Sequence, residues 1–205
     1  MEYDYKYKEI LRNNMVKDNI VDAYAFESYF IINNSIRRKR ISKTIYNAIA
    51  HIISIIDRMP GLPEDTVIYR ALNNECYENL DIGESIIDEA FTSFTISETM
   101  GNSMTSNATM ESILPKGTKF IYIGAEYEIL TYPGVKYTIE DKTTIKVYKV
   151  ELPKYYVDLE SIYNLDNIKS YVDESLDNDY KGIPNLESSE YYTYIVEKLN
   201  LEEYI

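Results

Sequence analysis

The stretch IGAEYEILTYPGVKYTI, residues 123–139, has the composition of a β region. Residues 119–123 and 128–131 are apolar and β-branched, as expected of strands. Tyr132-Pro133-Gly134 is typical of a turn, and residues 135–140 then resume a strand pattern. We therefore predict short strands joined by turns across this part of the chain.

Two carboxylates, Glu126 and Glu128, stand one residue apart at the start of the second of these strands. Side chains alternate between the faces of a strand, so an extended 126–128 segment would direct both carboxylates the same way. Two like charges on one side repel each other, and a cationic or electron-poor ligand between them would relieve the repulsion. The alternative is a solvated, polar strand face.

Outside this stretch the hydrophobic period changes along the chain. The first third has three- and four-residue apolar spacing, which predicts helices, and the segment Pro60-Gly61-Leu62-Pro63 ends the last of them. The middle of the chain has two-residue spacing, which predicts strands. We expect helices over residues 5–14, 18–33 and 41–58, and strands over 66–71, 90–96 and 143–152. Residues 101–112 predict an exposed loop, with or without a short helix. Helices followed by strands indicate an α+β fold class.

Residues 153–205 differ from the rest in being strongly acidic. Their apolar residues predict one helix around residues 159–172 and another around 191–199. We therefore predict one domain over residues 1–152, with a helical part at 1–60 and a β core at 64–152. An acidic, mainly helical C-terminal extension then covers 153–205.

The overall composition excludes several classes of protein. Cys76 and His51 are the single cysteine and histidine, which excludes an internal disulfide and a cysteine-rich zinc site and argues against a histidine-based metal centre. The net charge of −13 disfavours a nucleic-acid partner. No apolar stretch reaches membrane-spanning length and no secretory signal is visible, so we expect no membrane partner and action inside a cell. Secretion by a route without such a signal stays open.

Two further segments carry polar groups that suit an anionic ligand. Arg70 lies at the end of the apolar strand 66–71, where its planar guanidinium could hold a phosphate, or could instead pair with a neighbouring Glu at the rim. In the strand 90–96, alternation puts Phe91, Ser93 and Thr95 on one face. Two hydroxyls on one face can orient a carboxylate without changing its charge.

In this order, the three segments resemble the Arg-Ser-Glu class of mono-ADP-ribosyltransferases, toxin-like or viral, with a Glu-x-Glu block of the arginine-specific type. VIYRALN (67–73) resembles the first strand of that family, and IIDEAFTSFTIS (86–97) resembles its Ser-Thr-Ser strand. The stretch 123–139 is similar to its Glu-x-Glu block, and YFIINNSIRRKR (29–40) to the preceding helix. The resemblance covers roughly residues 20–150. It implies N-terminal helices packed on a mixed or antiparallel two-sheet β core.

The resemblance also implies roles for single residues. Arg70, followed by Ala71, would bind a phosphate of NAD, and Ser93 with Thr95 would position the catalytic Glu128. Glu126 would act on the acceptor, which is arginine in family members that carry Glu there. The implied enzyme is a glycosyltransferase that uses NAD as co-substrate, needs no metal, releases nicotinamide and modifies a protein.

The sequence departs from the family pattern at two places. Phe94 and Thr95 stand where Thr and the second Ser are usual, although Thr95 keeps a hydroxyl. Only Gly124-Ala125 precede Glu126, where the family has a longer turn with an aromatic residue that helps to recognise the target. The shortened turn leaves an NAD glycohydrolase, with water as acceptor, as an alternative. A catalytically degenerate module that binds NAD or a protein is another. A nucleic-acid acceptor, served by the basic run 37–40, is disfavoured by the acidic surface.

Overall fold

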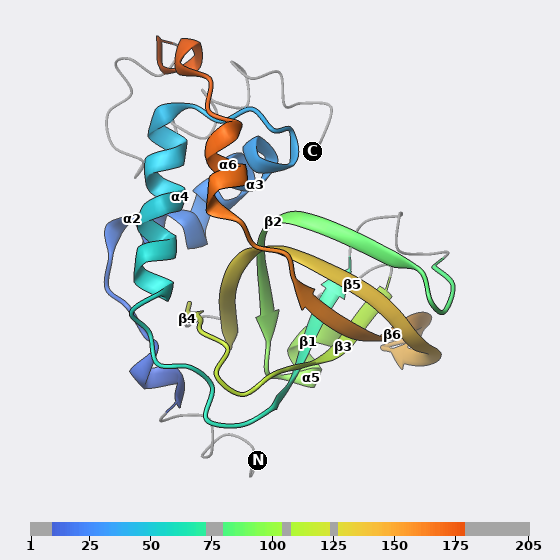
Figure 1. Cartoon of the computed structure of the whole chain (residues 1–205). Coiled ribbons are helices and arrows are strands. Elements are labelled where there is room, and N and C mark those ends of the chain that lie inside the picture. The colour runs from blue at the N-terminus through green and yellow to red at the C-terminus, as the bar shows by residue number, and fades with distance from the viewer. Residues whose placement is uncertain (1–9, 73–79, 104–107, 124–126, 179–205) are drawn as a thin grey trace. The chain divides into compact units, whose positions relative to one another are not determined.

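The computed structural model describes residues 10–72, 80–103, 108–123 and 127–178 (Figure 1). The chain divides into two compact units. The β unit comprises residues 1–15 and 56–163, and the helical unit comprises residues 16–55 and 164–205.

The helical unit is formed by helices from both ends of the chain. α2 (Asn19–Ala23), a π-helical turn η1 (Tyr24–Ser28) and α3 (Tyr29–Arg37) follow one another without a break, and α4 (Lys43–Ile56) comes next. The short α6 (Leu165–Ser170) and η3 (Glu174–Asn178) return to this unit. The isoleucines of α4 form its buried stripe: Ile45, Ile49, Ile52, Ile53 and Ile56. This helix and its buried face are as the sequence predicts.

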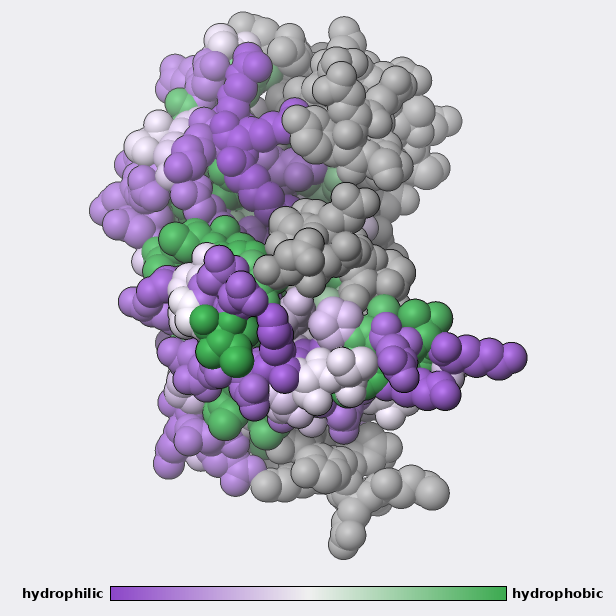
Figure 2. Space-filling view, turned by 90° about the vertical axis from the view of Figure 1, so that its right-hand side faces the viewer, coloured by the Kyte–Doolittle hydropathy of each residue, from purple (hydrophilic) through white to green (hydrophobic). Residues whose placement is uncertain are grey.

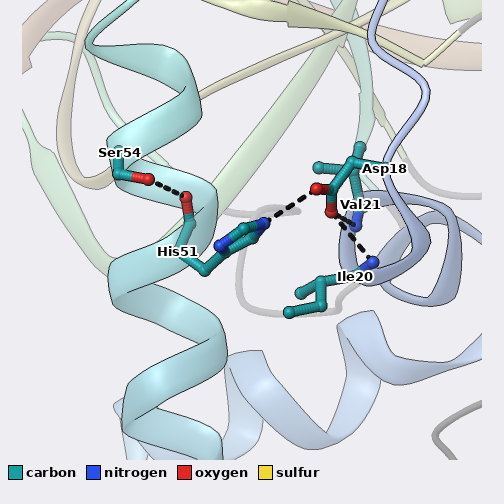
Figure 3. Close-up of polar contacts among 5 residues, drawn as sticks. All are labelled: Asp18, Ile20, Val21, His51 and Ser54. Carbon is teal, nitrogen blue, oxygen red and sulfur yellow. Dashed lines mark hydrogen bonds and ion pairs between the residues drawn. The ribbon is translucent and has the colours of Figure 1, made fainter.

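A polar contact fastens the beginning of α2 to the middle of α4 (Figure 3). Asp18 is the N-cap of α2, and its Oδ1 accepts hydrogen bonds from the amides of Ile20 and Val21 at 2.9 and 3.2 Å. Its Oδ2 lies 2.8 Å from Nε2 of His51, which is half-exposed. Burial acts to raise the pKa of Asp18, but the hydrogen bonds from His51 and the two amides outweigh it and lower that pKa below 3.8.

This contact predicts a pH-dependent loss of stability in the Asp18→Asn variant. Asn still caps the helix, so the substitution removes mainly the charge, and we expect a loss of about 0.5–1 kcal/mol at pH 7. Because the folded-state pKa is lowered, the carboxylate stabilises the fold above pH 3.8 and ceases to do so as the pH falls through the lowered value. Urea unfolding of both proteins between pH 7 and pH 3 measures this. A difference that does not shrink in acid would contradict the account.

The β unit is a six-stranded sheet with the helix α5 (Glu98–Ser103) beside it (Figure 1). The strand order is β2-β1-β3-β6-β5-β4, and β5 also pairs with β2. The β3–β6 pair is parallel and the other pairs are antiparallel. The strands are β1 (Thr66–Leu72), β2 (Ser85–Thr95), β3 (Ala108–Leu114), β4 (Ile121–Tyr122), β5 (Glu128–Val147) and β6 (Val150–Ser161).

The predicted α+β class with a mixed β core is confirmed, and the long strand β5 explains how the core is connected. One part of β5 pairs with β2 and β4, and β6 pairs along it from Val135 to Val147. The resemblance implies two sheets. In the structure β5 pairs with β2 and β4 and also with β6, so the six described strands form one hydrogen-bonded network. Its interior includes Ile68, Phe94, Met110, Phe120, Ile129 and Tyr155.

Four local predictions are wrong. The strand predicted at 143–152 is divided by a hairpin turn, because β5 ends at Val147 and β6 begins at Val150. The predicted turn at residues 132–134 lies inside β5, where Gly134 has φ +85° and its carbonyl accepts a hydrogen bond from Ile162. The predicted loop at 101–112 contains most of the strand β3, while the end of α5 agrees with the short helix that the prediction left open. Most of the helix predicted at 159–172 is absent, because β6 continues to Ser161 and only α6 follows.

The predicted domain boundary after residue 152 lies within β6. The division into residues 1–152 and 153–205 stays a prediction. The helix predicted at 191–199 falls outside the described residues, as does much of the one at 5–14.

One face of the molecule shows how the described hydrophobic surface residues are distributed. Figure 2 shows them on one face as separate small groups among hydrophilic residues, in the part of the face that is described. Val67 and Ile113, partners on β1 and β3, are both exposed. In the described ranges, no helix combines the length and the apolar character needed to cross a membrane.

Candidate active site

Glu128 is the first residue of β5 and is held between two neighbouring strands. Its carbonyl accepts a hydrogen bond from the amide of Ile123 at 2.9 Å, next to the β4 pairing, and on the other side it lies opposite Thr95 of β2. The carbonyl of Tyr127 accepts a further bond from Ile96 at 3.4 Å. These contacts fix the backbone from which the half-buried Glu128 side chain extends.

Tyr127 changes the interpretation of the Glu-x-Glu stretch. It has φ +54°, in the left-handed region that a bulky residue seldom adopts, and its side chain is 38% exposed. The backbone at Tyr127 is therefore not extended, although the predicted alternation from Glu126 to Glu128 requires an extended residue there. Glu126 itself falls outside the described residues.

The two hydroxyls predicted on β2 lie on the same face as Glu128. Ser93 is opposite Leu130 and Thr95 is opposite Glu128, and directly opposed residues of an antiparallel pair point to the same side. Oγ1 of Thr95 accepts a hydrogen bond from the amide of Ser97 at 3.1 Å. The hydroxyl of Thr95 is thus on a residue directly opposite Glu128, as the predicted orienting role requires.

Arg70 reaches β2 from the neighbouring strand β1. These two strands pair at Tyr69 and Thr95, and next to that pair the Nη1 of Arg70 donates to the carbonyl of Ser93 at 2.6 Å. The alternative role of Arg70 requires an ion pair with a neighbouring Glu at the rim. Among the residues that the structure describes, no carboxylate forms such a pair with Arg70. Several donors of the guanidinium remain for an anion. Ala71 follows on β1, half-buried and opposite Thr109.

The structure thus gathers most of the predicted site residues on three adjoining strands. Arg70 comes from β1, Ser93 and Thr95 come from β2, and Glu128 comes from β5. A carboxylate on the strand face that carries two hydroxyls can accept a hydrogen bond from a ligand hydroxyl and stabilise a developing cation. A guanidinium on the neighbouring strand can hold a phosphate.

The sequence gives little indication of the elements that support these strands. Gly101 of α5 lies so close to β1 that an added Cβ would be 2.6 Å from the Cβ of Tyr69. The glycine falls in a stretch predicted to be a loop, so the sequence pattern does not indicate that a helix packs closely on β1 at this point. Lys154 of β6 is 4% exposed. It stands between the buried Leu152 and Tyr155, and hydrophobic periodicity alone does not explain why a lysine is buried there.

Comparison with known proteins gives matches in structure. No protein-family model matches the sequence, and neither does any curated protein sequence. The solved structures that match include Plx2a, an ADP-ribosyltransferase toxin from Paenibacillus larvae. It is 14% identical with a TM-score of 0.61, over 78% of this chain and 94% of that one. C3stau2 from S. aureus, solved with NAD, is 17% identical with a TM-score of 0.59, over 78% of this chain and 96% of that one.

A third match is to a longer protein. BECa, the ADP-ribosylating toxin of a binary enterotoxin of C. perfringens, solved with NADH, is 19% identical with a TM-score of 0.57. The alignment covers 77% of this chain and 46% of BECa, so the chain spans about half the length of that toxin. The chain shares the fold of solved ADP-ribosyltransferase toxins.

Proposed function

We propose that this chain is an NAD-dependent mono-ADP-ribosyltransferase that transfers ADP-ribose to a protein arginine. The observation that carries the proposal is the meeting of Arg70, Ser93, Thr95 and Glu128 on adjoining strands of this fold. These are the residues to which the resemblance to the Arg-Ser-Glu class assigns the same chemistry. The C3stau2 structure with NAD supports NAD as co-substrate.

In this mechanism Arg70 binds a phosphate of NAD through the donors that Ser93 leaves free. Thr95 and Ser93 orient the carboxylate of Glu128, which accepts a hydrogen bond from a ribose hydroxyl. The bond between nicotinamide and ribose breaks with both electrons going to nicotinamide, which leaves as a neutral ring. The positive charge that develops on the ribose is stabilised by Glu128 most strongly in the transition state, and this lowers the barrier.

The acceptor then supplies an electron pair to the ribose carbon. A protonated guanidinium is a poor nucleophile, so a base has to remove its proton as the new bond forms. We assign that role to Glu126, and the exposed Tyr127 beside it is available to contact the acceptor. With water in place of the guanidinium, the same site would be an NAD glycohydrolase, and the short Gly124-Ala125 approach favours this second candidate.

The Glu126→Gln variant separates the two activities. We expect it to lower transfer to the arginine analogue agmatine about a hundredfold, because a general base contributes about 10²–10⁴ and Gln cannot take the proton. Nicotinamide release in the absence of agmatine should change less than threefold, because Glu128 is intact. Radiolabelled NAD with chromatography of the products measures both.

The matched control is Glu160→Gln, which makes the same change on β6 at a residue paired with Lys136. Equal loss of transfer and hydrolysis in Glu126→Gln would contradict the assigned role. Nicotinamide release without labelled agmatine in the wild type would favour the glycohydrolase.

A further inference from the structure

Lys154 is a buried cation that joins three elements of the β unit. It lies on β6 with a side chain 5% exposed. Its Nζ is 2.7 Å from a carboxylate oxygen of Glu111 on β3 and 3.0 Å from one of Glu98, the first residue of α5. Two ion pairs from different elements are what a buried ammonium requires to stay charged.

Aromatic rings complete the surroundings of this ammonium. Nζ lies 5.4 Å from the ring centroid of Tyr69 and 5.5 Å from that of Tyr156, within the range of a cation–π contact. Burial alone would lower the pKa of Lys154, but its hydrogen bonds to Glu111 and Glu98 raise that pKa overall. The lysine is therefore charged at neutral pH, and it holds α5 against the strands β3 and β6.

The helix held in this way lies directly on the candidate site. A Cβ on Gly101 would be 2.6 Å from the Cβ of Tyr69, 3.4 Å from Cγ2 of Thr95 and 3.6 Å from the amide nitrogen of Arg70. The helix is also bound to β2 through the hydrogen bond from Ser97 to Thr95. A shift of α5 would therefore act on the residues beneath it, among them Arg70 and Thr95.

We propose that Lys154 and Glu98 are positioning residues for the NAD site. Their ion pair seats α5 on the backbone of Arg70 and the side chain of Thr95, and so fixes the guanidinium for the phosphate. Neither residue contacts the reacting atoms in this account. The inference rests on the proposed function, because it concerns the geometry of the same site.

The Glu98→Gln variant tests this inference, because Glu98 is 56% exposed and its replacement leaves the Lys154–Glu111 pair intact. We expect the KM for NAD in nicotinamide release to rise about tenfold, with kcat within about threefold of the wild type. Hydrogen exchange of the α5 amides should become faster, and exchange in β3 and β6 should not. A merely structural role would reduce the fraction of active protein, lowering kcat and leaving KM unchanged.

The control is again Glu160→Gln, which breaks an exposed ion pair of the same 3.0 Å length elsewhere in the β unit. A KM for Glu98→Gln equal to that of Glu160→Gln, with unchanged exchange in α5, overturns the positioning role. Calorimetry of the wild type with NAD separates this failure from a failure of the proposed function. Wild-type protein that binds and cleaves NAD retains the proposed function and isolates the inference, whereas wild-type protein that does not cleave NAD, whether or not it binds it, refutes the proposed function and the inference with it.

Discussion

Replacing Glu128 with Gln should lower the kcat of nicotinamide release about a thousandfold. The side chain keeps its size and its place opposite Thr95, but it loses the negative charge that faces the developing ribose cation. Removing one preorganised electrostatic contact typically lowers kcat by a factor of about 10²–10³. The loss of a full negative charge next to a developing cation is expected to give a factor at the upper end of that range. Because Gln can still accept a hydrogen bond from the ribose, the KM for NAD should change less than threefold.

This result is interpretable only if the variant is folded. Glu128 is half-buried at the end of a strand, and its backbone bond with Ile123 does not involve the side chain, so the thermal midpoint should move by only a few degrees. Steady-state kinetics and circular dichroism on the same preparation measure both quantities. A folded Glu128→Gln protein with a tenth or more of the wild-type kcat would show that this carboxylate is not the catalytic one.

Replacing Arg70 with Lys should weaken NAD binding by about 10- to 100-fold. Lysine keeps the charge but loses the planar fork that can hold the Ser93 carbonyl and a phosphate at the same time. The kcat at saturating NAD should fall much less than in Glu128→Gln, because the carboxylate and its hydroxyl neighbours remain. Calorimetric titration with NAD, together with the KM, measures the effect.

The matched substitution is Arg12→Lys, at an exposed arginine of the same unit. It should leave both the affinity and the kinetics unchanged. If Arg70→Lys binds NAD as tightly as Arg12→Lys does, Arg70 has only the structural role of bridging β1 and β2.

Regular periodicity made the larger elements predictable from the sequence. The isoleucines of α4 repeat at three and four residues because one face of that helix is buried along its whole length. The strands β1 and β2 carry dense β-branched and aromatic residues, and both were placed to within a few residues at their C-terminal ends. The α+β class follows from the order of these two patterns.

Tertiary pairing decided the parts that the sequence did not predict. β3 reads Ala-Thr-Met-Glu-Ser-Ile-Leu, which has no strong strand signal, but it is flanked by β1 and β6, which satisfy its backbone groups. The Pro-Gly pair in β5 suggests a turn, yet Gly134 adopts a positive φ inside a strand that continues because β6 pairs beside it.

The candidate site was partly predictable for the same reasons. Arg70, Ser93, Thr95 and Glu128 could be selected because their order along the chain resembles that of the Arg-Ser-Glu class, whereas each residue alone is an ordinary polar residue of a strand. Their meeting requires the β1–β2 and β2–β5 pairings, which a single sequence does not specify. The conformation of Tyr127 and the contacts of Lys154 with α5 depend on residues distant in sequence, so local pattern could not show them.

The most direct test of the central claim is proton NMR of NAD incubated with the wild-type chain. Cleavage of the nicotinamide–ribose bond predicts free nicotinamide in large molar excess over the protein, with an equal amount of ADP-ribose free or attached to an acceptor. The Glu128→Gln protein, under the same conditions, should release about a thousandfold less. Folded wild-type protein that leaves NAD intact, both alone and with agmatine, would contradict the account.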